Sequence, residues 1–403
     1  MTRAAARGRF RQRLLVLFLL AMLIPYGRQV VSSPTLGQDF RAFFAAATVV
    51  AQQGDPYHWP TLGAAEYRLY DASGDIKPAD PTYYEFLAYP EGPWLAFALV
   101  PLTGLPWTYA YVIFALLLGL ILVSAAFGTC ALLRWPRRRA ALAAGCTLLS
   151  AVGFINLFMG QVSVLVFGAF VAAWLLAARG RPWLAGAVLA LVWMKPNIGL
   201  PLPLVLALLE PAVARRMIGG FMVASAALFG VAFTVLGTGF FDWPLQVPRM
   251  WQAVQGLQPD MASVESFFYP GLGGWIKTAA LLVTLLAATA YGSWAIRRAP
   301  DAHTRGLTVL ILWLFGLPFV QSYDLILLLP AVVLLLGARL EGWDDLTVEL
   351  TIWGFAAIPL LYFLGARVGY FNGFTVIPFS VLVLAWHRRM LSRRAVPAQA
   401  RAA

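Results

Sequence analysis

The sequence has 403 residues, of which 61% are hydrophobic and 12% charged, and its formal net charge is +12. About a quarter of the residues of a soluble domain are charged, so the composition excludes an ordinary soluble protein. The arginines cluster in short connections between long apolar runs, which argues against nucleic-acid binding and is typical of helical membrane proteins that follow the positive-inside rule.

The N-terminal part begins with a basic tail, residues 1–13, which we place in the cytoplasm. An uncleaved first span follows at 14–31 and leads to a long extracytoplasmic loop at 32–92, rich in Tyr, Asp and Pro. The short segment 92–106 contains several prolines, and we expect it to be re-entrant or interfacial rather than spanning.

The remaining apolar runs alternate with arginine-rich turns, and every arginine cluster then falls on the cytoplasmic side. This alternation predicts one all-α domain over residues 1–403, a polytopic bundle of about twelve transmembrane helices. After 14–31 the predicted spans are 107–133, 140–158, 162–178, 182–194, 198–210, 217–237, 276–296, 305–320, 325–337, 346–364 and a last span before the cytoplasmic tail at 388–403. A second extracytoplasmic loop is expected at 238–275.

The turns on the far side of the membrane contain the side chains that could take part in a reaction, while the cytoplasmic turns offer little except arginine. We therefore predict an active site on the far side, at the level of the lipid headgroups. Its candidate residues are Asp39, Arg41, Gln161, Lys195, Tyr323, Asp324 and Arg367.

Asp39 stands at the start of an expected amphipathic helix with Phe40, Phe43 and Phe44 on its apolar side. One interpretation is a helix N-cap, a position that aspartate favours. The other is a general base that removes a proton from an acceptor hydroxyl. The two are compatible, because a helix N-terminus also keeps a carboxylate ionised.

Lys195 lies in the turn between two short apolar runs. Helices of about 13 residues reach about 20 Å, less than the hydrocarbon core of about 30 Å, so we expect this turn below the membrane surface. A lysine there either snorkels to the interface or binds an anion, most simply the phosphate of a lipid-linked substrate. Arg367 has the same two interpretations, and Arg41 is a further candidate phosphate contact.

Two other positions, and the aromatic first loop, also have two interpretations each. Asp324 opens an apolar run and is either a helix cap or a ligand of the substrate. Gln161 is a partner for a sugar hydroxyl or an ordinary turn residue. The aromatic first loop suits sugar stacking, but aromatic residues also gather at membrane interfaces. The histidines are scattered, and we expect no metal site and no cofactor.

Five segments occur in an order and spacing that resemble a known family. They are "DFRAFFAAATVVAQQGDPYHWP" (39–60), "FLAYPEGPWLAFALVPLTGLP" (86–106), "GQVS" (160–163), "WMKPNIGLPL" (193–202) and "SYDLILLLPAVVLLL" (322–336). Over about residues 14–337 the chain resembles membrane glycosyltransferases of the GT-C superfamily, in particular family GT87. Two departures stand out: Glu91-Gly92 interrupts the family's Tyr-Pro-Pro, and Ser163 replaces an asparagine.

The resemblance implies a glycosyltransferase that moves a sugar, most simply mannose, from a polyprenyl-phosphate donor to a lipid or glycan acceptor with inversion. It implies Asp39 as catalytic base and places Lys195, Tyr323 and Asp324 at the same cavity. Combining this with the candidate residues above, we predict Lys195 as the leading phosphate contact with Arg367 and Arg41 as secondary ones, and substrate contacts from Gln161, Tyr89, Tyr323 and Asp324. The resemblance places the protein in a bacterial inner membrane, with the site facing the periplasm and both termini in the cytoplasm. The partners are then the lipid-linked donor, the acceptor and membrane lipids, without nucleic acid.

Two other classes of protein compete with this interpretation. A transporter or flippase of lipid-linked sugars predicts polar groups at the membrane midplane and on both faces, whereas the cytoplasmic turns here offer mostly arginine. A membrane acyltransferase lacks an obvious histidine-centred site on the far face.

Overall fold

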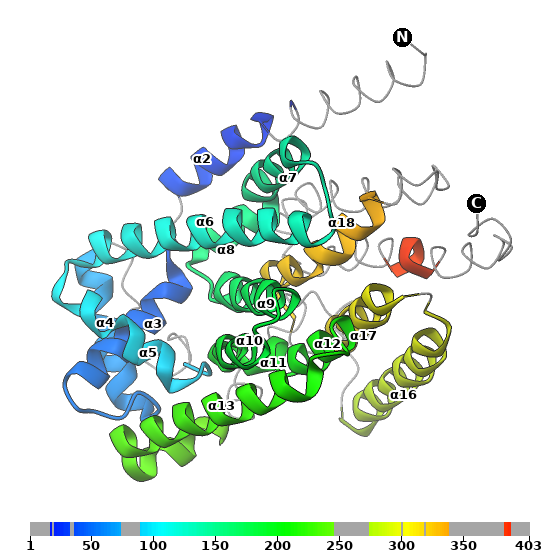
Figure 1. The fold of residues 1–403 in the computed structure, drawn as a ribbon. Helices are drawn as coiled ribbons and strands as arrows, with labels where there is room; N and C mark the ends of the chain where they lie inside the picture. The colour runs from blue at the N-terminus through cyan, green and yellow to red at the C-terminus, as the bar shows by residue number, and fades with distance from the viewer. Residues whose placement is uncertain are drawn as a thin grey trace, which may run out of the picture.

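The computed structural model is helical throughout the part of the chain that it describes, as Figure 1 shows. The expected all-α class is confirmed for these residues. They are residues 17, 20–32, 36–73, 89–245, 274–299, 301–317, 320–337 and 383–387.

The helices follow the predicted apolar runs, but several runs are divided into two. The first elements in chain order are α2 (Leu23–Ser32), α3 (Gln38–Ala51), α4 (Trp59–Ser73), α5 (Pro93–Leu99), η1 (Val100–Gly104), α6 (Trp107–Leu132), α7 (Arg137–Leu149), α8 (Ala151–Met159) and α9 (Ser163–Ala178). They are followed by α10 (Pro182–Leu189), η2 (Ala190–Met194), α11 (Pro196–Gly199), α12 (Leu202–Leu209), α13 (Ala214–Leu236), η3 (Gly237–Asp242), α16 (Gly274–Arg298), α17 (Ala302–Gly316), η5 (Ser322–Leu328) and α18 (Leu329–Gly337).

Two described helices are long and apolar enough to cross a membrane, α6 and the stretch Ala214–Leu245 that begins with α13. Helices α7 and α8 form a third span if taken together, although they meet at an angle of 55°. The run predicted as one span at 140–158 is broken because the Ser150 side chain accepts a hydrogen bond from Gly153 N at 3.1 Å and caps α8. The predicted count of about twelve spans is not confirmed, and 346–364 lies outside the described residues.

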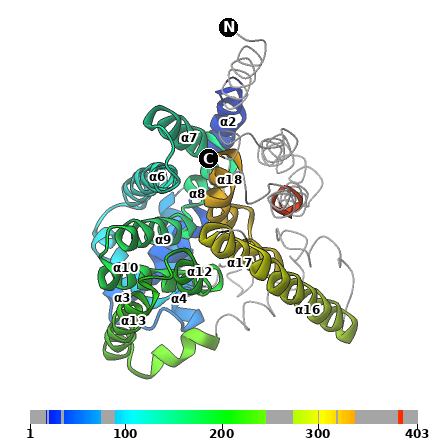
Figure 2. The same ribbon diagram turned by 45° about the vertical axis from the view of Figure 1, so that its right-hand side comes forward.

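The central helices pack side by side in the order α6, α9, α10, α13 (Figure 1). Helix α12 contacts α17, which contacts α16, and Figure 2 shows α16 extending away from the central group. Helices α10 and α13 approach each other closely, because a Cβ added to Gly186 would lie only 2.0 Å from Met217 O. Small residues at a helix crossing allow backbones to approach in this way.

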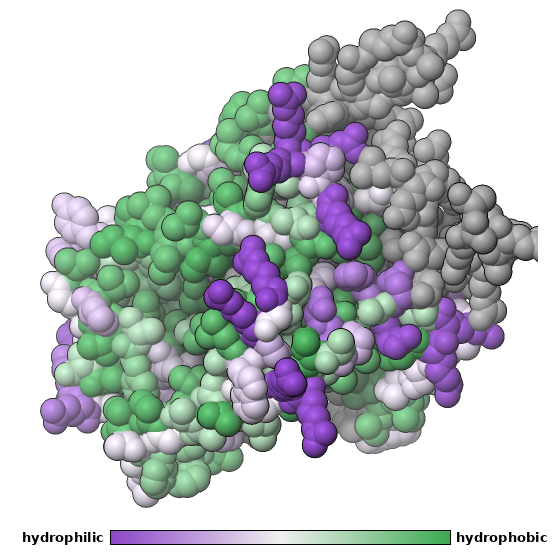
Figure 3. Space-filling model, in the orientation of Figure 1, coloured by the Kyte–Doolittle hydropathy of each residue, from purple (hydrophilic) through white to green (hydrophobic). Residues whose placement is uncertain are grey.

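A broad apolar surface covers the central helices in Figure 3, beside a band of hydrophilic residues. On α6, Tyr109, Leu116 and Leu120 are about two-thirds exposed, at 66%, 70% and 66%. On α13, Val223 is 67% exposed. Exposed apolar faces of this extent mark contact with another apolar medium, which for helices of this hydropathy is the lipid bilayer.

Helix α3 is buried nearly all round, which corrects the expectation of an interfacial helix with one apolar side. Its residues from Phe40 to Ala47 are all buried. It packs against α4, α5, η1 and α8, and the Phe40 ring stacks on Trp107 and Phe114 at centroid distances of 5.2 and 4.7 Å. Protein rather than lipid headgroups therefore fixes the position of Asp39.

Candidate functional site

The N-terminus of α3 is attached to the turn between α8 and α9. Gly37 N donates to Phe158 O at 2.7 Å, and Gly37 adopts a left-handed conformation with φ of 66°. Gly160 is also left-handed, with φ of 73°, and a Cβ there would lie 2.6 Å from the Cβ of Phe40. The two glycines allow the chains to approach closely, and this contact brings Asp39 next to Gln161.

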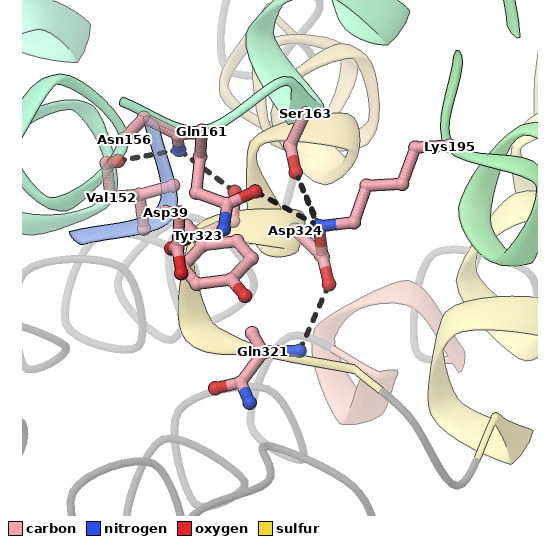
Figure 4. Close-up of polar contacts among 9 residues, drawn as sticks. All are labelled: Asp39, Val152, Asn156, Gln161, Ser163, Lys195, Gln321, Tyr323 and Asp324. Atoms are coloured by element: carbon pink, nitrogen blue, oxygen red, sulfur yellow. Dashed lines mark hydrogen bonds and ion pairs between the residues drawn. The ribbon is translucent and has the colours of Figure 1, made fainter. Parts of the chain in front are cut away.

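Gln161 links Asp39 to Lys195, as Figure 4 shows. Its Nε2 donates to Asp39 Oδ2, and its Oε1 accepts a hydrogen bond from Lys195 Nζ at 3.3 Å. The expectation that Asp39 caps α3 is wrong, since the N-cap residue is Gly37 and no side chain caps this helix end. Among the described residues, Asp39 Oδ1 has no hydrogen-bond partner.

Lys195 lies at the break between η2 and α11, where the chain bends before Pro196. The residue before a proline avoids the helical conformation, and Lys195 has φ of −142° and ψ of 82°. Its side chain is buried, and Nζ also donates to Ser163 Oγ at 3.0 Å and to Asp324 Oδ1 at 2.7 Å. All three ammonium hydrogens are therefore engaged, and Lys195 does not snorkel to the surface.

Asp324 both caps a helix and pairs with the lysine. Its Oδ2 accepts a hydrogen bond from Gln321 N at 3.0 Å in a capping box at the start of η5. Its Oδ1 forms the ion pair with Lys195 Nζ and accepts a hydrogen bond from the hydroxyl of Ser163 at 2.6 Å. The cap interpretation of Asp324 is confirmed, and the ion pair is a contact that the sequence did not reveal.

The remaining contacts attach η5 to the same place. Asn156 Nδ2 on α8 donates to Tyr323 O at 2.9 Å and to Val152 O at 2.8 Å. The ring of Tyr323 lies over the lysine, with its centroid 4.4 Å from Lys195 Nζ, which is cation–π geometry. Figure 4 shows Tyr323, Asp39, Gln161 and the ion pair together.

The net charge of this cluster depends on Asp39. Lys195 and Asp324 neutralise each other, which leaves the charge of Asp39. Burial raises the pKa of Asp39 to about 6, while the Gln161 hydrogen bond and the charge of Lys195 lower it. Asp39 is therefore mostly ionised at neutral pH and takes up a proton in mildly acidic solution.

Three predicted site residues lie elsewhere or outside the described part. Tyr89 is buried, and its hydroxyl donates to Gly92 O at 2.8 Å and accepts from Ala96 N at 3.0 Å, so it holds the turn before α5. Arg41 is buried with its guanidinium 5.6 Å from the Trp107 ring, and two helix positions after Asp39 it lies on another side of α3. Arg367 lies outside the described residues. Substrate roles for all three stay predictions.

Sequence reasoning missed Asn156 as a site residue and named Ser163 only as a departure from a family pattern. Asn156 lies before and Ser163 after the break between α8 and α9 at Gly160. Helix breaks are the signal that marks this site, because Lys195 and Gln321 also lie at breaks. Within the described ranges, no group of three or more His, Cys, Asp and Glu side chains is arranged to hold a metal ion.

The apolar helices and the charged cluster at their broken ends define a helical membrane protein with a buried polar site. The model of glycosyltransferase family 87 matches residues 86–321, more than half of the chain, and the protein belongs to this family. This membership agrees with the GT-C superfamily and makes the protein a glycosyltransferase. The matched range includes Gln161 and Lys195 and excludes Asp39 and Asp324. No curated protein and no solved structure matches the chain.

Proposed function

We propose that the protein transfers a sugar, most simply mannose, from a polyprenyl-phosphate donor to a hydroxyl group of a lipid or glycan acceptor. The observation that carries this proposal is the state of Asp39: Gln161 holds one carboxylate oxygen, and the other has no partner among the described residues. A general base needs this arrangement, because one oxygen fixes its orientation while the other takes the proton. Its raised pKa of about 6 also suits a base at neutral pH.

The leaving group of such a donor is a phosphate, so the reaction needs a cation more than a general acid. Lys195 is a cation that Gln161 connects to Asp39. Its contact with Gln161 Oε1 is the longest of its three, at 3.3 Å, and a phosphate oxygen would replace that contact at least cost. Arg41 and Arg367 stay predicted as secondary phosphate contacts, although Arg41 lies on another side of α3 than Asp39. Attack from the Asp39 side with phosphate leaving on the other inverts the anomeric centre.

The positions of the arginines support a site facing the periplasm of a bacterial inner membrane. Helix α9 begins at the site and ends beside Arg179 and Arg181, which are exposed. Helix α7 begins at Arg137, and its continuation α8 ends at the site. By the positive-inside rule the arginine ends lie in the cytoplasm, and the site then lies on the opposite face. Both chain termini are cytoplasmic in this topology.

The test is transfer of radiolabelled sugar from a polyprenyl-phosphate mannose by the purified protein to glycolipids extracted from its own membranes. Asp39→Asn removes the base, and we expect kcat to fall by about 10²–10⁴ while the donor still binds. Asp55→Asn is the matched control, because Asp55 is also half-buried but accepts a hydrogen bond from Tyr57 N outside the site. Asp39→Asn with wild-type turnover would contradict the proposal, and label that moves without covalent transfer would indicate a transporter.

The same assay gives a prediction of pH dependence. Asp39 must be ionised to accept a proton, so kcat/KM rises with pH and levels off above the pKa of the free enzyme, about 6. Below pH 6 the rate falls about ten-fold per pH unit as the carboxylate is protonated. A flat profile between pH 5 and 7 in the wild-type protein would show that this carboxylate is not the base.

A further inference from the structure

Glu91 is a second acid beside the site, in the short segment that precedes α5. Hydrogen bonds from several directions fix the backbone of this segment. Tyr57 Oη donates to Glu91 O at 2.9 Å, and Tyr89 Oη donates to Gly92 O at 2.8 Å. Trp243 Nε1 donates to Pro90 O at 3.1 Å. The position of Glu91 is therefore determined by the fold before any ligand arrives.

The same segment is attached to the lysine turn. Gly92 N donates to Met194 O at 3.4 Å, one residue before Lys195. Gly92 has no room for a side chain, because a Cβ there would lie 2.4 Å from the Trp94 indole. The backbone that carries Glu91 thus lies against the backbone that carries Lys195.

The carboxyl group of Glu91 is buried and incompletely paired. The residue is 6% exposed, and its Oε2 is a buried atom with no hydrogen-bond partner in the described part of the chain. A buried polar atom without a partner costs free energy. Such an atom beside a polar site indicates a partner that a ligand supplies.

The charges of the site also act on this side chain. Burial raises the pKa of Glu91 to about 8, the charge of Lys195 lowers it, and the charges of Asp39 and Asp324 raise it further. Lys195, Asp39 and Asp324 therefore all influence Glu91, and the raised pKa keeps its carboxyl group mostly protonated at pH 7. A neutral carboxyl group has one O–H donor as well as acceptor oxygens, which matches a hydroxyl group better than a phosphate.

We propose that Glu91 is a substrate-binding residue whose carboxyl group exchanges hydrogen bonds with a hydroxyl of a sugar held beside Asp39 and Lys195. This inference rests on the proposed function and adds a contact that the family's Tyr-Pro-Pro pattern lacks. The sugar belongs either to the donor or to the acceptor, since both bring hydroxyl groups to the reacting centre.

The experiment measures binding of two probes to the full-length protein in detergent: polyprenyl-phosphate mannose and the same polyprenyl phosphate without sugar. Glu91→Leu removes the hydrogen bonds, and Glu91→Gln keeps a neutral donor and acceptor. Glu210→Gln is the matched control, because Glu210 accepts a hydrogen bond from Trp174 Nε1 at 3.1 Å at the end of α12, outside the site. Thermal unfolding of each variant checks that it is folded.

If Glu91 binds the donor sugar, Glu91→Leu weakens binding of the mannosyl probe about ten-fold, the loss of one good hydrogen bond. Binding of the sugar-free probe does not change, and Glu91→Gln stays within about three-fold of wild type. If Glu91 binds the acceptor sugar, both probes bind Glu91→Leu normally, and the KM for extracted glycolipid acceptors rises about ten-fold instead.

Unchanged donor binding together with an unchanged acceptor KM in Glu91→Leu would overturn the inference while leaving the proposed function intact. A wild-type protein that binds neither probe would overturn both, because the inference depends on this donor. Equal losses for the two probes would also overturn it, since a hydroxyl contact cannot affect a probe that lacks the sugar.

Discussion

Gln161 connects two groups of opposite charge without a charge of its own. An amide has donors at one end and an acceptor at the other, so the carboxylate of Asp39 faces Nε2 and the ammonium of Lys195 faces Oε1. Reversing the amide would set its oxygen against the carboxylate and its NH2 group against the ammonium. The side chain is therefore held in one orientation, and it sets the separation between the proposed base and the proposed phosphate contact.

Variants of the buried ion pair of Lys195 and Asp324 can distinguish a structural role of Lys195 from a role in binding the substrate. Lys195→Met alone leaves Asp324 buried without its partner, which costs about 3–5 kcal/mol. We expect Lys195→Met with Asp324→Asn to recover more than half of that loss, because no charge is then left unpaired. Unfolding of the single and double variants, monitored in detergent, measures this coupling.

Binding of polyprenyl phosphate should not follow the same pattern. If Lys195 contacts the phosphate, both the single and the double variant bind this probe about ten-fold more weakly, as expected for a lost charge-assisted hydrogen bond. Recovery of stability without recovery of binding supports the phosphate contact. Joint recovery of both in the double variant would mean that Lys195 acts only by pairing with Asp324.

At the scale of elements, the site forms where helices break rather than where they run. The turn at Gly160 and the extended residue Lys195 each separate two helices, and the capping box at Gln321 begins η5. Broken helices within a membrane protein are tolerated where the freed backbone groups are satisfied by protein. Tight packing of the intact helices around them keeps the breaks in register.

The α10–α13 contact tests that packing. A Cβ on Gly186 would lie 2.0 Å from Met217 O and 2.5 Å from Phe221 N, both backbone atoms that cannot move independently. We expect Gly186→Ala to lower stability by about 1–3 kcal/mol, the usual cost of overpacking. The measurement is the thermal unfolding midpoint in detergent.

Gly230 on α13 provides the control, because a Cβ there meets nothing within 4 Å. Gly230→Ala should be neutral or slightly stabilising, since glycine costs about 0.5–1 kcal/mol relative to alanine within a helix. A loss of the same size in both variants would show that the close approach of α10 and α13 does not determine the effect, since helix propensity alone favours alanine at both positions.

The sequence predicted well those elements that depend on local pattern. The span expected at 107–133 is α6, Trp107–Leu132, because Pro106 precedes a continuous apolar run. The break inside 140–158 was missed, because Ser150 is a single small residue within an apolar run and its cap becomes visible only in three dimensions. Local pattern also could not show that α3 is buried nearly all round.

The candidate residues were found one by one, but their partners were not. Lys195 and Asp324 are 129 positions apart, and Asp39 and Gln161 are 122 apart. No periodicity or motif spacing connects such positions. Whether Asp39 caps α3 depended on how the start of this helix is held, where Gly37 N reaches Phe158 O in a contact between distant segments.

In the molecule as a whole, the site residues and the exposed arginines lie at opposite ends of the helices. Site residues lie at one end of α8, α9 and η2, and exposed arginines lie at the other end of α7, α9 and α13. An arginine is costly to move across a bilayer, so the proposed topology keeps the arginine ends of these helices in the cytoplasm. The orientation can be tested without any substrate.

Labelling of a single introduced cysteine shows which side of the membrane it faces, once Cys130 and Cys146 are replaced by alanine. Gln52 and Arg181 are both exposed, the first after α3 and the second in the turn between α9 and α10. We expect a membrane-impermeant maleimide to label Gln52→Cys in intact spheroplasts and to label Arg181→Cys only after permeabilisation. Because an inverted protein exchanges the two results, labelling of Arg181→Cys from outside would place the site in the cytoplasm, where a periplasmic acceptor cannot reach Asp39.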